Sequence, residues 1–354
     1  MRKRIEPPGS PGMRRKGQAA LSLLFWALGI AVMLAPFLRS RDTADEEGPD
    51  PVREASEQDR SFREALAAFD AEHGADLTGA LVAAERKYFT QGADQIDALV
   101  DFSRLPSGQA SYQRHCFGCH GTLADGAGPA ARHLKPRPRV FTSGVFKFTS
   151  TPTGNPPLRS DLYQTLTRGL AGSSMPNFRL LPDELRWDLV EYVRFSAMKG
   201  TFENLVLEIA QDDEEVPSEE DMADYADIVF ERWDPEELKA VYPPIPEPPF
   251  SESSVARGRE VFTDPAGANC ASCHGNTGVG DGPSAKNFHD DWGYPIQPRD
   301  LTSGVFRAGD TSADLYRTIM TGINGTPMPS YSATIPPEDI WALVHFIQSL
   351  EVKQ

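Results

Sequence analysis

The sequence predicts an all-α protein with two similar domains, and three observations support this fold class. A segment of roughly 100 residues, a size typical of one small domain, occurs twice, at residues 104–200 and 251–354. Each copy closes on an apolar stripe at helical spacing, formed in the first copy by Leu189, Val190 and Val193. The segments between are rich in Gly and Pro and lack the alternation typical of a β-strand. We call the two copies the first domain and the second domain.

The chain has 354 residues, a hydrophobic content of 40% and a formal net charge of −16. This composition can form a core, and the acidic balance argues against a nucleic-acid partner, since phosphates bind Lys and Arg. The charge is uneven. Residues 1–41 carry eight basic side chains and one acid, a net of +7, whereas the other 313 residues carry a net of −23.

The basic N-terminus precedes an uncharged segment. Residues 19–38 contain no charged side chain and are long enough as a helix to cross a bilayer. Basic side chains in residues 1–18 predict a cytoplasmic flank, a single-pass anchor in the bacterial inner membrane, and periplasmic domains. The alternative is a cleaved signal peptide, whose apolar run is usually about 7–15 residues before a small-residue cleavage site. The longer run here favours an uncleaved anchor.

Two further segments flank the first domain. Residues 39–103 are predicted to form a helical spacer, with helices near 61–71 and 80–89. Residues 201–250 contain 16 acids against two basic residues, include a helical piece near 222–233, and end in a proline-rich stretch. This segment is interpreted either as a solvated linker or as an acidic docking surface for a basic partner, and charge runs more often solvate.

The repeat extends to local motifs. The segment Pro138–Phe146 recurs as Pro298–Phe306, with Pro-Arg, Thr-Ser-Gly-Val-Phe in common. Each copy also opens on a predicted short helix, at 108–112 and at 258–262. Because these helices supply little apolar surface, we expect a cofactor to fill the centre of each domain.

All four cysteines belong to two C-x-x-C-H segments, Cys116-Phe117-Gly118-Cys119-His120 and Cys270-Ala271-Ser272-Cys273-His274. This spacing is the attachment signal for c-type haem, in which both thiols reach the vinyl groups and the histidine becomes the proximal iron ligand. A zinc site would place the two pairs about 15–20 residues apart, and a thioredoxin-like pair needs a βαβ context. Disulfides are not needed once haem consumes every thiol. The sequence therefore predicts two covalently bound haem c groups, each with an iron.

The sixth iron ligands are predicted from matched methionines. Met175 and Met328 lie 55 and 54 residues after the motif histidines, each before a proline in a Gly-containing loop. Methionine often only fills a core, but a thioether at the same place in both copies suits low-spin haem. The other candidates are His115, His133 and His345, which have no histidine counterpart in the other copy, and His289, which lies in an insertion unique to the second copy. We expect these four histidines at the surface.

These motifs resemble the class I c-type cytochromes in a tandem, dihaem arrangement that covers about 200 residues of the chain. The resemblance implies two class I cytochrome c-like haem domains, in which a proline carbonyl accepts a hydrogen bond from the proximal imidazole. Pro129 and Pro283 match that proline. Arg139 and Arg299 are candidates for the haem propionates or for a simple surface role. The aromatic residues of the two crossing helices are matched by Tyr112 and Trp187, and by Phe262 and Trp341.

The predicted function is electron transfer between a membrane respiratory complex and a redox protein, because His/Met ligation keeps substrate away from the iron. An anchor followed by two haem domains also resembles the dihaem subunit of cbb3-type oxidases. The alternative is a dihaem peroxidase-type enzyme, which needs one displaceable iron ligand beside an acid/base group. A haem-based sensor is the third class considered. The matched methionines favour the carrier.

Overall fold

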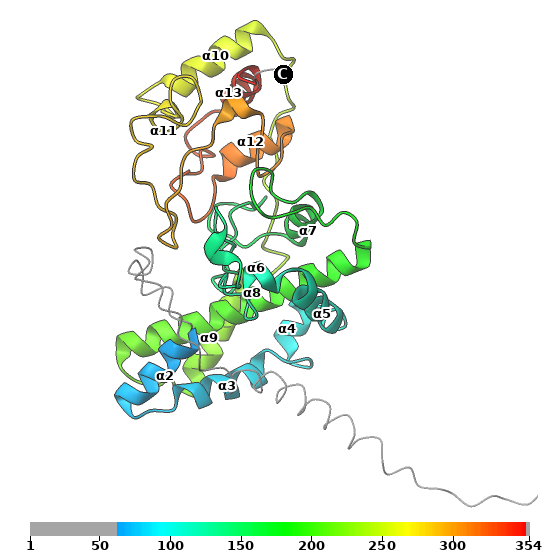
Figure 1. Cartoon of the computed structure of the whole chain (residues 1–354), viewed down its shortest axis with the longest axis vertical. Helices are drawn as coiled ribbons and strands as arrows, with labels where there is room; N and C mark the ends of the chain where they lie inside the picture. The colour runs from blue at the N-terminus through cyan, green and yellow to red at the C-terminus, as the bar shows by residue number, and fades with distance from the viewer. Residues whose placement is uncertain (1–61, 352–354) are drawn as a thin grey trace, which may run out of the picture. The chain divides into compact units, whose positions relative to one another are not determined.

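The computed structural model describes residues 62–351, and Figure 1 shows them with their helices labelled. The anchor predicted at residues 19–38 and its basic flank lie outside the described residues. In the described range, no helix combines the length and the apolar composition that crossing a membrane requires.

Residues 62–351 are helical, as the sequence predicts, and contain no β-strand; His289 and Pro295 form an isolated bridge. The helices in chain order are α2 (Phe62–His73), α3 (Leu77–Tyr88), α4 (Asp94–Leu99), α5 (Leu105–His115), α6 (Phe117–His120), α7 (Arg159–Arg168), α8 (Asp183–Asp213), α9 (Glu219–Arg232), α10 (Glu252–Thr263), α11 (Ala271–His274), α12 (Ser312–Thr321) and α13 (Pro337–Ser349). Two 3-10 turns accompany them, η3 (Ala131–His133) and η4 (Leu301–Ser303).

The repeat is visible as two matched helix crossings, α5 against α8 and α10 against α13. A Cβ atom on Gly108 would lie 2.2 Å from the carbonyl oxygen of Asp188, and one on Gly258 would lie 1.9 Å from that of Ala342. Only glycine allows helices to approach so closely. The predicted crossing of opening and closing helices is therefore confirmed in both domains.

Matched aromatic pairs fix the third helix of each domain against the closing helix. The Tyr163 ring of α7 stacks on Trp187 with 4.1 Å between ring centres. In the second domain, Tyr316 of α12 packs on Trp341 at 4.4 Å. Offset and tilted aromatic pairs of this kind stabilise beyond the area they bury. The same three-helix frame therefore forms twice.

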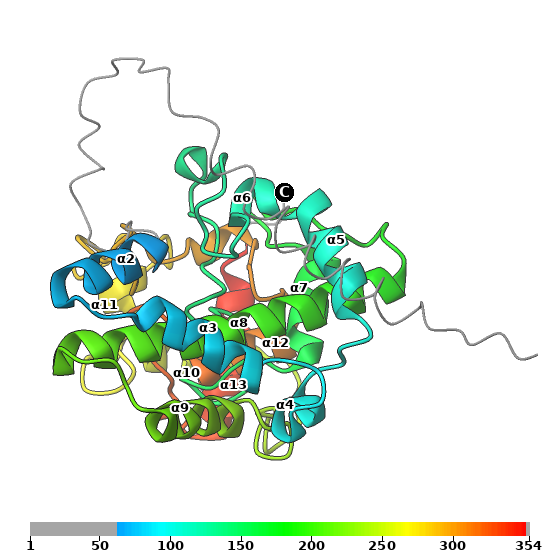
Figure 2. The ribbon, with the colours of Figure 1, turned by 90° about the horizontal axis from the view of Figure 1, so that it is seen from below.

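The first domain continues into a larger core than the sequence predicts. Helix α8 runs through the predicted boundary at residue 200, and Phe202, Val206 and Ala210 are buried at four-residue spacing. The second half of α8 packs with α2, α3, α4 and α9, which we together call the helical scaffold. Helices α3, α8 and α9 lie side by side in both views (Figures 1 and 2). The predicted spacer thus belongs to the first domain.

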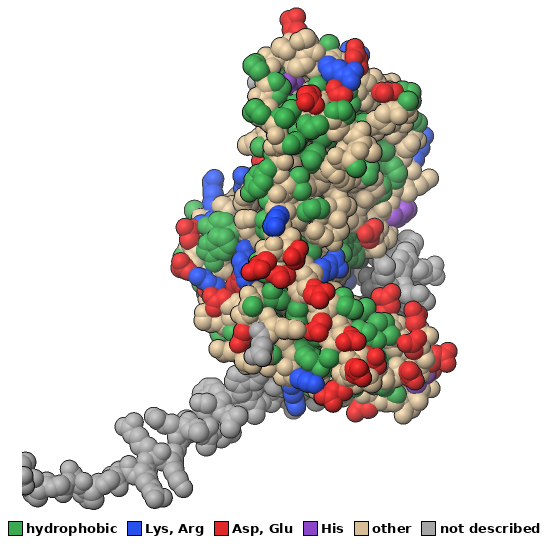
Figure 3. Space-filling model, turned by 180° about the vertical axis from the view of Figure 1, so that it is seen from behind, with side chains coloured by type: hydrophobic (Ala, Val, Ile, Leu, Met, Phe, Trp, Pro, Cys, Tyr) green, Lys and Arg blue, Asp and Glu red, His purple; other side chains and the backbone are tan. Residues whose placement is uncertain are grey.

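The segment predicted as an acidic linker is folded over residues 201–233. Helix α9 begins at a capping box in which Ser218 and Asp221 exchange hydrogen bonds. Its apolar side buries Val229, Phe230 and Trp233, while its acidic side chains face solvent. Figure 3 shows many acidic side chains on this part of the surface, in the lower half of the view. The segment forms an amphipathic helix despite its high charge, because its few apolar residues are regularly spaced.

The proline-rich part, residues 234–250, contacts both domains. The Val241 N–H donates to the Ser150 carbonyl at 2.6 Å in the first domain. In the second domain, the Trp341 Nε1–H donates to the Ile245 carbonyl at 3.2 Å. The connector is therefore held at both ends rather than only solvated.

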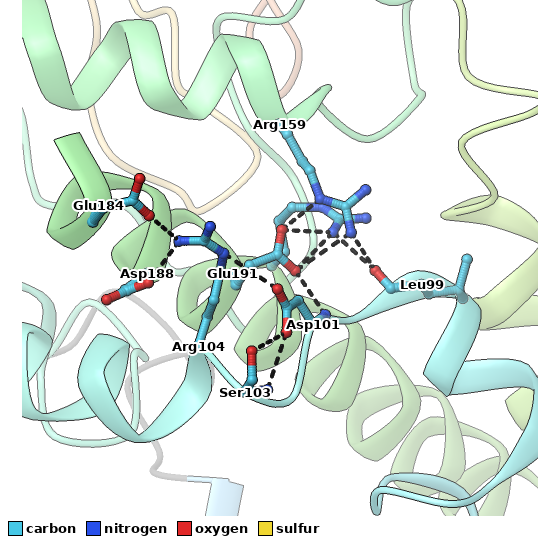
Figure 4. A network of polar contacts seen from close by, with 9 residues as sticks. Leu99, Asp101, Ser103, Arg104, Arg159, Glu184, Asp188 and Glu191 are labelled. Carbon is cyan, nitrogen blue, oxygen red and sulfur yellow. Dashed lines mark hydrogen bonds and ion pairs between the residues drawn. The ribbon is translucent and has the colours of Figure 1, made fainter.

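Within the first domain, ion pairs join the segment after α4 to α5 and to the start of α8 (Figure 4). Arg104, which precedes α5, contacts Asp101 at 3.2 Å, Glu184 at 3.0 Å and Asp188 at 2.9 Å. Two of these acids lie in the first turns of α8, where carboxylates also favour the helix dipole. Arg104 therefore links the scaffold, α5 and α8.

A second group in Figure 4 is buried around Glu191. Its carboxylate accepts hydrogen bonds from Arg159 at 2.5 Å and from Arg194 at 3.4 Å, and both arginines donate to the Leu99 carbonyl, at 2.7 and 3.0 Å. Burial lowers the pKa of Arg194 to about 10. Because the charges are paired and also bonded to the end of α4, the network orients the scaffold on the first domain.

Candidate haem sites

The first C-x-x-C-H segment forms a single helical turn. Cys116 ends α5 and caps α6, and His120 is the last residue of α6. The His120 N–H donates to the Cys116 carbonyl at 2.9 Å, and the Cys119 N–H donates to the same carbonyl at 3.1 Å. Residues three and four positions apart share one face of a helix. Both thiols and the imidazole therefore project toward the same side.

The second segment repeats this turn. Cys270 caps α11, and the His274 N–H donates to its carbonyl at 2.8 Å. The Cys273 N–H donates to that carbonyl at 3.2 Å. All four cysteines carry free thiols. Each domain thus presents two thiols and one imidazole in the same local geometry.

The partner of the imidazole differs from the predicted one. Nδ1 of His120 lies 3.0 Å from the carbonyl oxygen of Arg139, and Nδ1 of His274 lies 3.0 Å from that of Arg299. As the donor in this bond, Nδ1 carries the proton and leaves Nε2 as the metal-binding atom. The expected proline carbonyls are therefore replaced by the carbonyls of the repeated Pro-Arg motif.

The loops that contain the prolines explain this correction. The Gly128 N–H donates to the Cys119 carbonyl at 3.2 Å, and the Gly282 N–H donates to the Cys273 carbonyl at 3.1 Å. Pro129 and Pro283 follow directly and are exposed. The carbonyl that contacts the imidazole comes later in the chain, ten residues after Pro129 and sixteen after Pro283.

Burial sets the protonation of these groups. It lowers the pKa of His120 and of His274, so both imidazoles are neutral near pH 7, the form that binds iron. Burial raises the pKa of Cys116 to about 12 and that of Cys270 to about 11, so both remain thiols. Each site therefore offers neutral donors.

The two methionine loops have the same hydrogen bonds. The Met175 N–H donates to Ser173 Oγ, and the Met328 N–H donates to Thr326 Oγ1, each at 3.2 Å. The Met175 carbonyl accepts from the Leu170 N–H and the Met328 carbonyl from the Ile323 N–H, each at 3.1 Å. Both side chains are half-buried. Coordination of iron by these thioethers stays a prediction, which the shared turn supports.

The donor set of each domain fits haem c. It consists of two free thiols, an imidazole with an available Nε2, and a thioether in a matched loop. Each domain also has a hydrophobic core of its own, so bound haem would add to this core.

Comparison with known proteins agrees with this donor set. Residues 103–193 match the family described as cytochrome c oxidase, cbb3-type, subunit III, and residues 255–351 match the family cytochrome c. A chain of the reducing HAO-like protein complex of Kuenenia stuttgartiensis is 30% identical, with a TM-score of 0.54. That alignment covers 70% of this chain and 96% of the other. This chain belongs to the c-type cytochromes with tandem haem domains.

A curated relative points to the same family. The cbb3-type cytochrome c oxidase subunit FixP of Azorhizobium caulinodans is 28% identical over 102 residues, which is 29% of either chain. The cytochrome therefore spans less than a third of that relative's length. Family membership implies covalently bound haem c with iron and a role in electron transfer.

The arginine side chains of the repeated motif have partners of their own. The Arg139 guanidinium carbon lies 3.7 Å from the ring centre of Trp292, in the second domain of the cytochrome. Nε of Arg299 donates to the Val305 carbonyl at 2.6 Å. Binding of propionates by these side chains stays a prediction, whereas the role of their carbonyls was not foreseen.

Two further neighbours of the site were not predicted. The Phe141 ring stacks on His120 with 4.5 Å between ring centres. The sequence signal for this ring is the repeated Pro-Arg-x-Phe/Leu segment, in which Phe141 corresponds to Leu301. Trp292 lies in the insertion unique to the second copy, where sequence comparison of the two domains has nothing to align.

The remaining histidines of the cytochrome separate into two groups. His115, His133 and His289 are exposed, as expected. His345 was expected at the surface and is fully buried, which corrects that prediction. Its Nδ1 lies 2.8 Å from Ser254 Oγ, and the Phe250 ring packs beside it at 5.2 Å. The connector covers this side of α13, and helical periodicity alone does not reveal such a cover.

Proposed function

We propose that this cytochrome is a membrane-anchored, periplasmic dihaem carrier that relays electrons between a respiratory membrane complex and a redox partner. The observation that carries the proposal is that each domain offers a proximal histidine with Nδ1 engaged and a matched methionine loop. When bound, the haem iron supplies reversible one-electron oxidation and reduction.

The chain's own residues favour transfer over catalysis on a bound substrate. The carbonyls of Arg139 and Arg299 fix the ring orientation and basicity of the two histidines. The methionine loops are closed by their own serine or threonine hydroxyls, and Met175 and Met328 would supply thioether ligands to the iron. If a histidine and a methionine held each iron, a peroxidase would have no free coordination site.

Attachment to a membrane and partner choice rest on the sequence and on the relatives. The uncharged residues 19–38 and the basic flank support an inner-membrane anchor. The FixP relative is named as a subunit of a cbb3-type oxidase, and the structural relative comes from a multiprotein complex. We propose a partner of the same kind, a membrane respiratory complex or a soluble redox protein. The acidic faces of α8 and α9 would steer a basic partner by long-range attraction.

Spectroscopy of the purified full-length protein tests the proposal. A haem determination should give two haems for each chain, and both oxidised haems should be low-spin with a methionine-to-iron absorption band. A high-spin haem in the untreated protein, together with peroxide turnover, would instead establish the peroxidase alternative. Fractionation of cells then tests the anchor: the full chain should sediment with membranes, and a chain lacking residues 1–41 but carrying a cleavable export signal should not.

A further inference from the structure

The two domains contact each other through charged and polar groups. Arg168 of α7 pairs with Asp314 of α12 at 3.2 Å. Nearby, the Gly154 N–H donates to Asn324 Oδ1 at 2.9 Å. Asn324 belongs to the loop that presents Met328. The domain interface therefore includes a methionine loop of one domain and backbone of the other.

The first of two reciprocal contacts between the domains begins at the second motif histidine, His274. The Arg299 carbonyl accepts from His274, while its side chain reaches the first domain. A Cβ atom on Gly172 would lie 3.1 Å from Arg299 Nη2 and 3.3 Å from Nη1, so the guanidinium lies directly against this glycine. Gly172 precedes Met175 by three residues. The proximal arginine of the second domain thus contacts the methionine loop of the first.

The reciprocal contact runs from the motif histidine of the first domain to the methionine loop of the second domain, and Trp292 lies between them. The Arg139 carbonyl accepts from His120, and its guanidinium stacks on Trp292 at 3.7 Å. Trp292 also approaches Gly325, where a Cβ atom would lie 2.6 Å from the indole ring. Gly325 precedes Met328 by three residues. The proximal arginine of the first domain thus reaches the methionine loop of the second through Trp292.

The segment that carries Trp292 is itself fastened at the interface. The Asp290 N–H donates to the Tyr294 carbonyl at 2.9 Å, which closes a tight turn around Trp292. The buried Asp290 carboxylate pairs with Lys147 of the first domain at 3.0 Å. The Asp291 N–H donates to the Gly325 carbonyl at 3.1 Å. Trp292 is therefore anchored on both domains and has little freedom to leave.

We infer that Arg299 and Trp292 are positioning residues that couple the two haem sites. Arg299, whose carbonyl contacts the motif histidine of the second domain, holds the Met175 loop of the first domain. Trp292, which stacks on Arg139 of the first domain, holds the Met328 loop of the second domain. The inference rests on the proposed assignment of Met175 and Met328 as ligands. Glycine at positions 172 and 325 is what allows the contacts, since a Cβ atom would displace the guanidinium or the indole. A substitution in the second domain therefore alters the haem site of the first domain.

Hydrogen exchange of the haem-loaded, full-length protein tests this crossed arrangement. With Arg299→Leu, amides 170–177 of the first domain should exchange about tenfold faster, while amides 323–330 keep their protection. The matched control is Arg259→Leu, an exposed arginine on α10 of the same domain, which should leave both loops unchanged. Unchanged exchange in 170–177, or loss confined to 323–330, would overturn the inference. If Arg299→Leu does not fold, Arg299→Lys provides the same comparison.

Trp292 provides the second arm. Trp292→Ala should accelerate exchange in 323–330, and Trp292→Phe, which keeps an aromatic face, should restore protection. Redox titration adds a readout at the iron: Arg299→Leu should shift the potential of the haem that Met175→Ala identifies as the first-domain haem. If the native protein shows no methionine band yet the crossed protection changes occur, the ligand assignment fails while the interface contact stands.

Discussion

The first and second domains have nearly the same haem-site geometry and very different support. Both contain a one-turn C-x-x-C-H helix, an imidazole bonded to an arginine carbonyl at 3.0 Å, and a methionine loop closed by a hydroxyl. The closing helix α13 ends after 13 residues, whereas α8 continues for 31 and gathers the helical scaffold. The comparison shows that the site geometry is a property of the repeat, whereas the helical scaffold packs on the longer closing helix, α8.

The largest expected effect comes from removing the centre of the scaffold. Trp233 is fully buried, with its ring 6.4 Å from Phe146 and the Arg194 guanidinium 5.6 Å from its centre. Trp233→Ala should lower the unfolding free energy of the first domain by about 3–5 kcal/mol, because it leaves a large cavity. Denaturant unfolding followed at each domain should show the second domain unchanged. Tyr242→Ala, at an exposed aromatic residue, is the control; equal losses in both domains would contradict an independent scaffold.

The matched glycines test how far each domain depends on its helix crossing. Gly258→Ala should destabilise the second domain by about 1–3 kcal/mol, since the new methyl group meets the Ala342 carbonyl. Gly108→Ala makes the same clash in the first domain, where the scaffold still holds α8. Thermal unfolding should therefore show the larger loss of midpoint temperature for Gly258→Ala, and the reverse order would refute the difference in support.

Substitution of the two loop methionines tests whether the two haem sites have the same iron ligands. Met175→Ala and Met328→Ala should each lower the potential of one haem by at least about 59 mV, a tenfold change in the one-electron equilibrium, because a thioether favours reduced iron. Both variants should keep covalent haem. Potentiometric titration checks the shift, with Met222→Ala, a scaffold methionine, as control. A variant that leaves both potentials unchanged would remove that methionine from the ligand set.

The smallest expected effect is on the pH dependence of the stability of the helical scaffold. Burial between α3 and α8 raises the pKa of Glu203 to about 7, although it bonds Lys199, which also pairs with Glu85 at 2.9 Å. Because the folded state holds this proton more tightly than the unfolded chain, the associated stability is present below pH 4.5 and lost as pH rises through 7. Glu203→Gln should flatten this dependence, an effect on the order of 1 kcal/mol. Denaturant midpoints at pH 5 and pH 8 provide the check, and a variant that retains the full slope would assign it to another group.

Several features of the fold could be read from local sequence. The spacing of Cys116, Cys119 and His120 fixes a helical turn, because residues three and four apart share a face. The helices expected near 61–71 and 80–89 are confirmed as α2 and α3. These predictions depend on interactions between residues close in the chain, so periodicity and motif spacing are sufficient to make them.

Other features depend on contacts between distant segments. The carbonyl of Pro129 was predicted to accept from His120, but the carbonyl of Arg139 does so. The family pattern predicts that a backbone carbonyl contacts the imidazole, but it does not specify the loop to which that carbonyl belongs. His345 is buried only because residues 241–250 return over α13. The continuation of α8 past residue 200 was hidden by acidic composition, although its buried positions repeat every four residues.

The sequence by itself determined the two C-x-x-C-H segments, the duplication and the all-helical class, since motif spacing and short-range periodicity specify them. Only the tertiary structure decided which carbonyl orients each histidine, that the acidic segment is part of a core, and that Arg299 and Trp292 cross between the domains. The physical reason is that these contacts join residues well beyond one helical turn, 19 positions apart for His120 and Arg139 and more than a hundred for the contacts between the domains, and their formation depends on packing energy summed over the whole molecule.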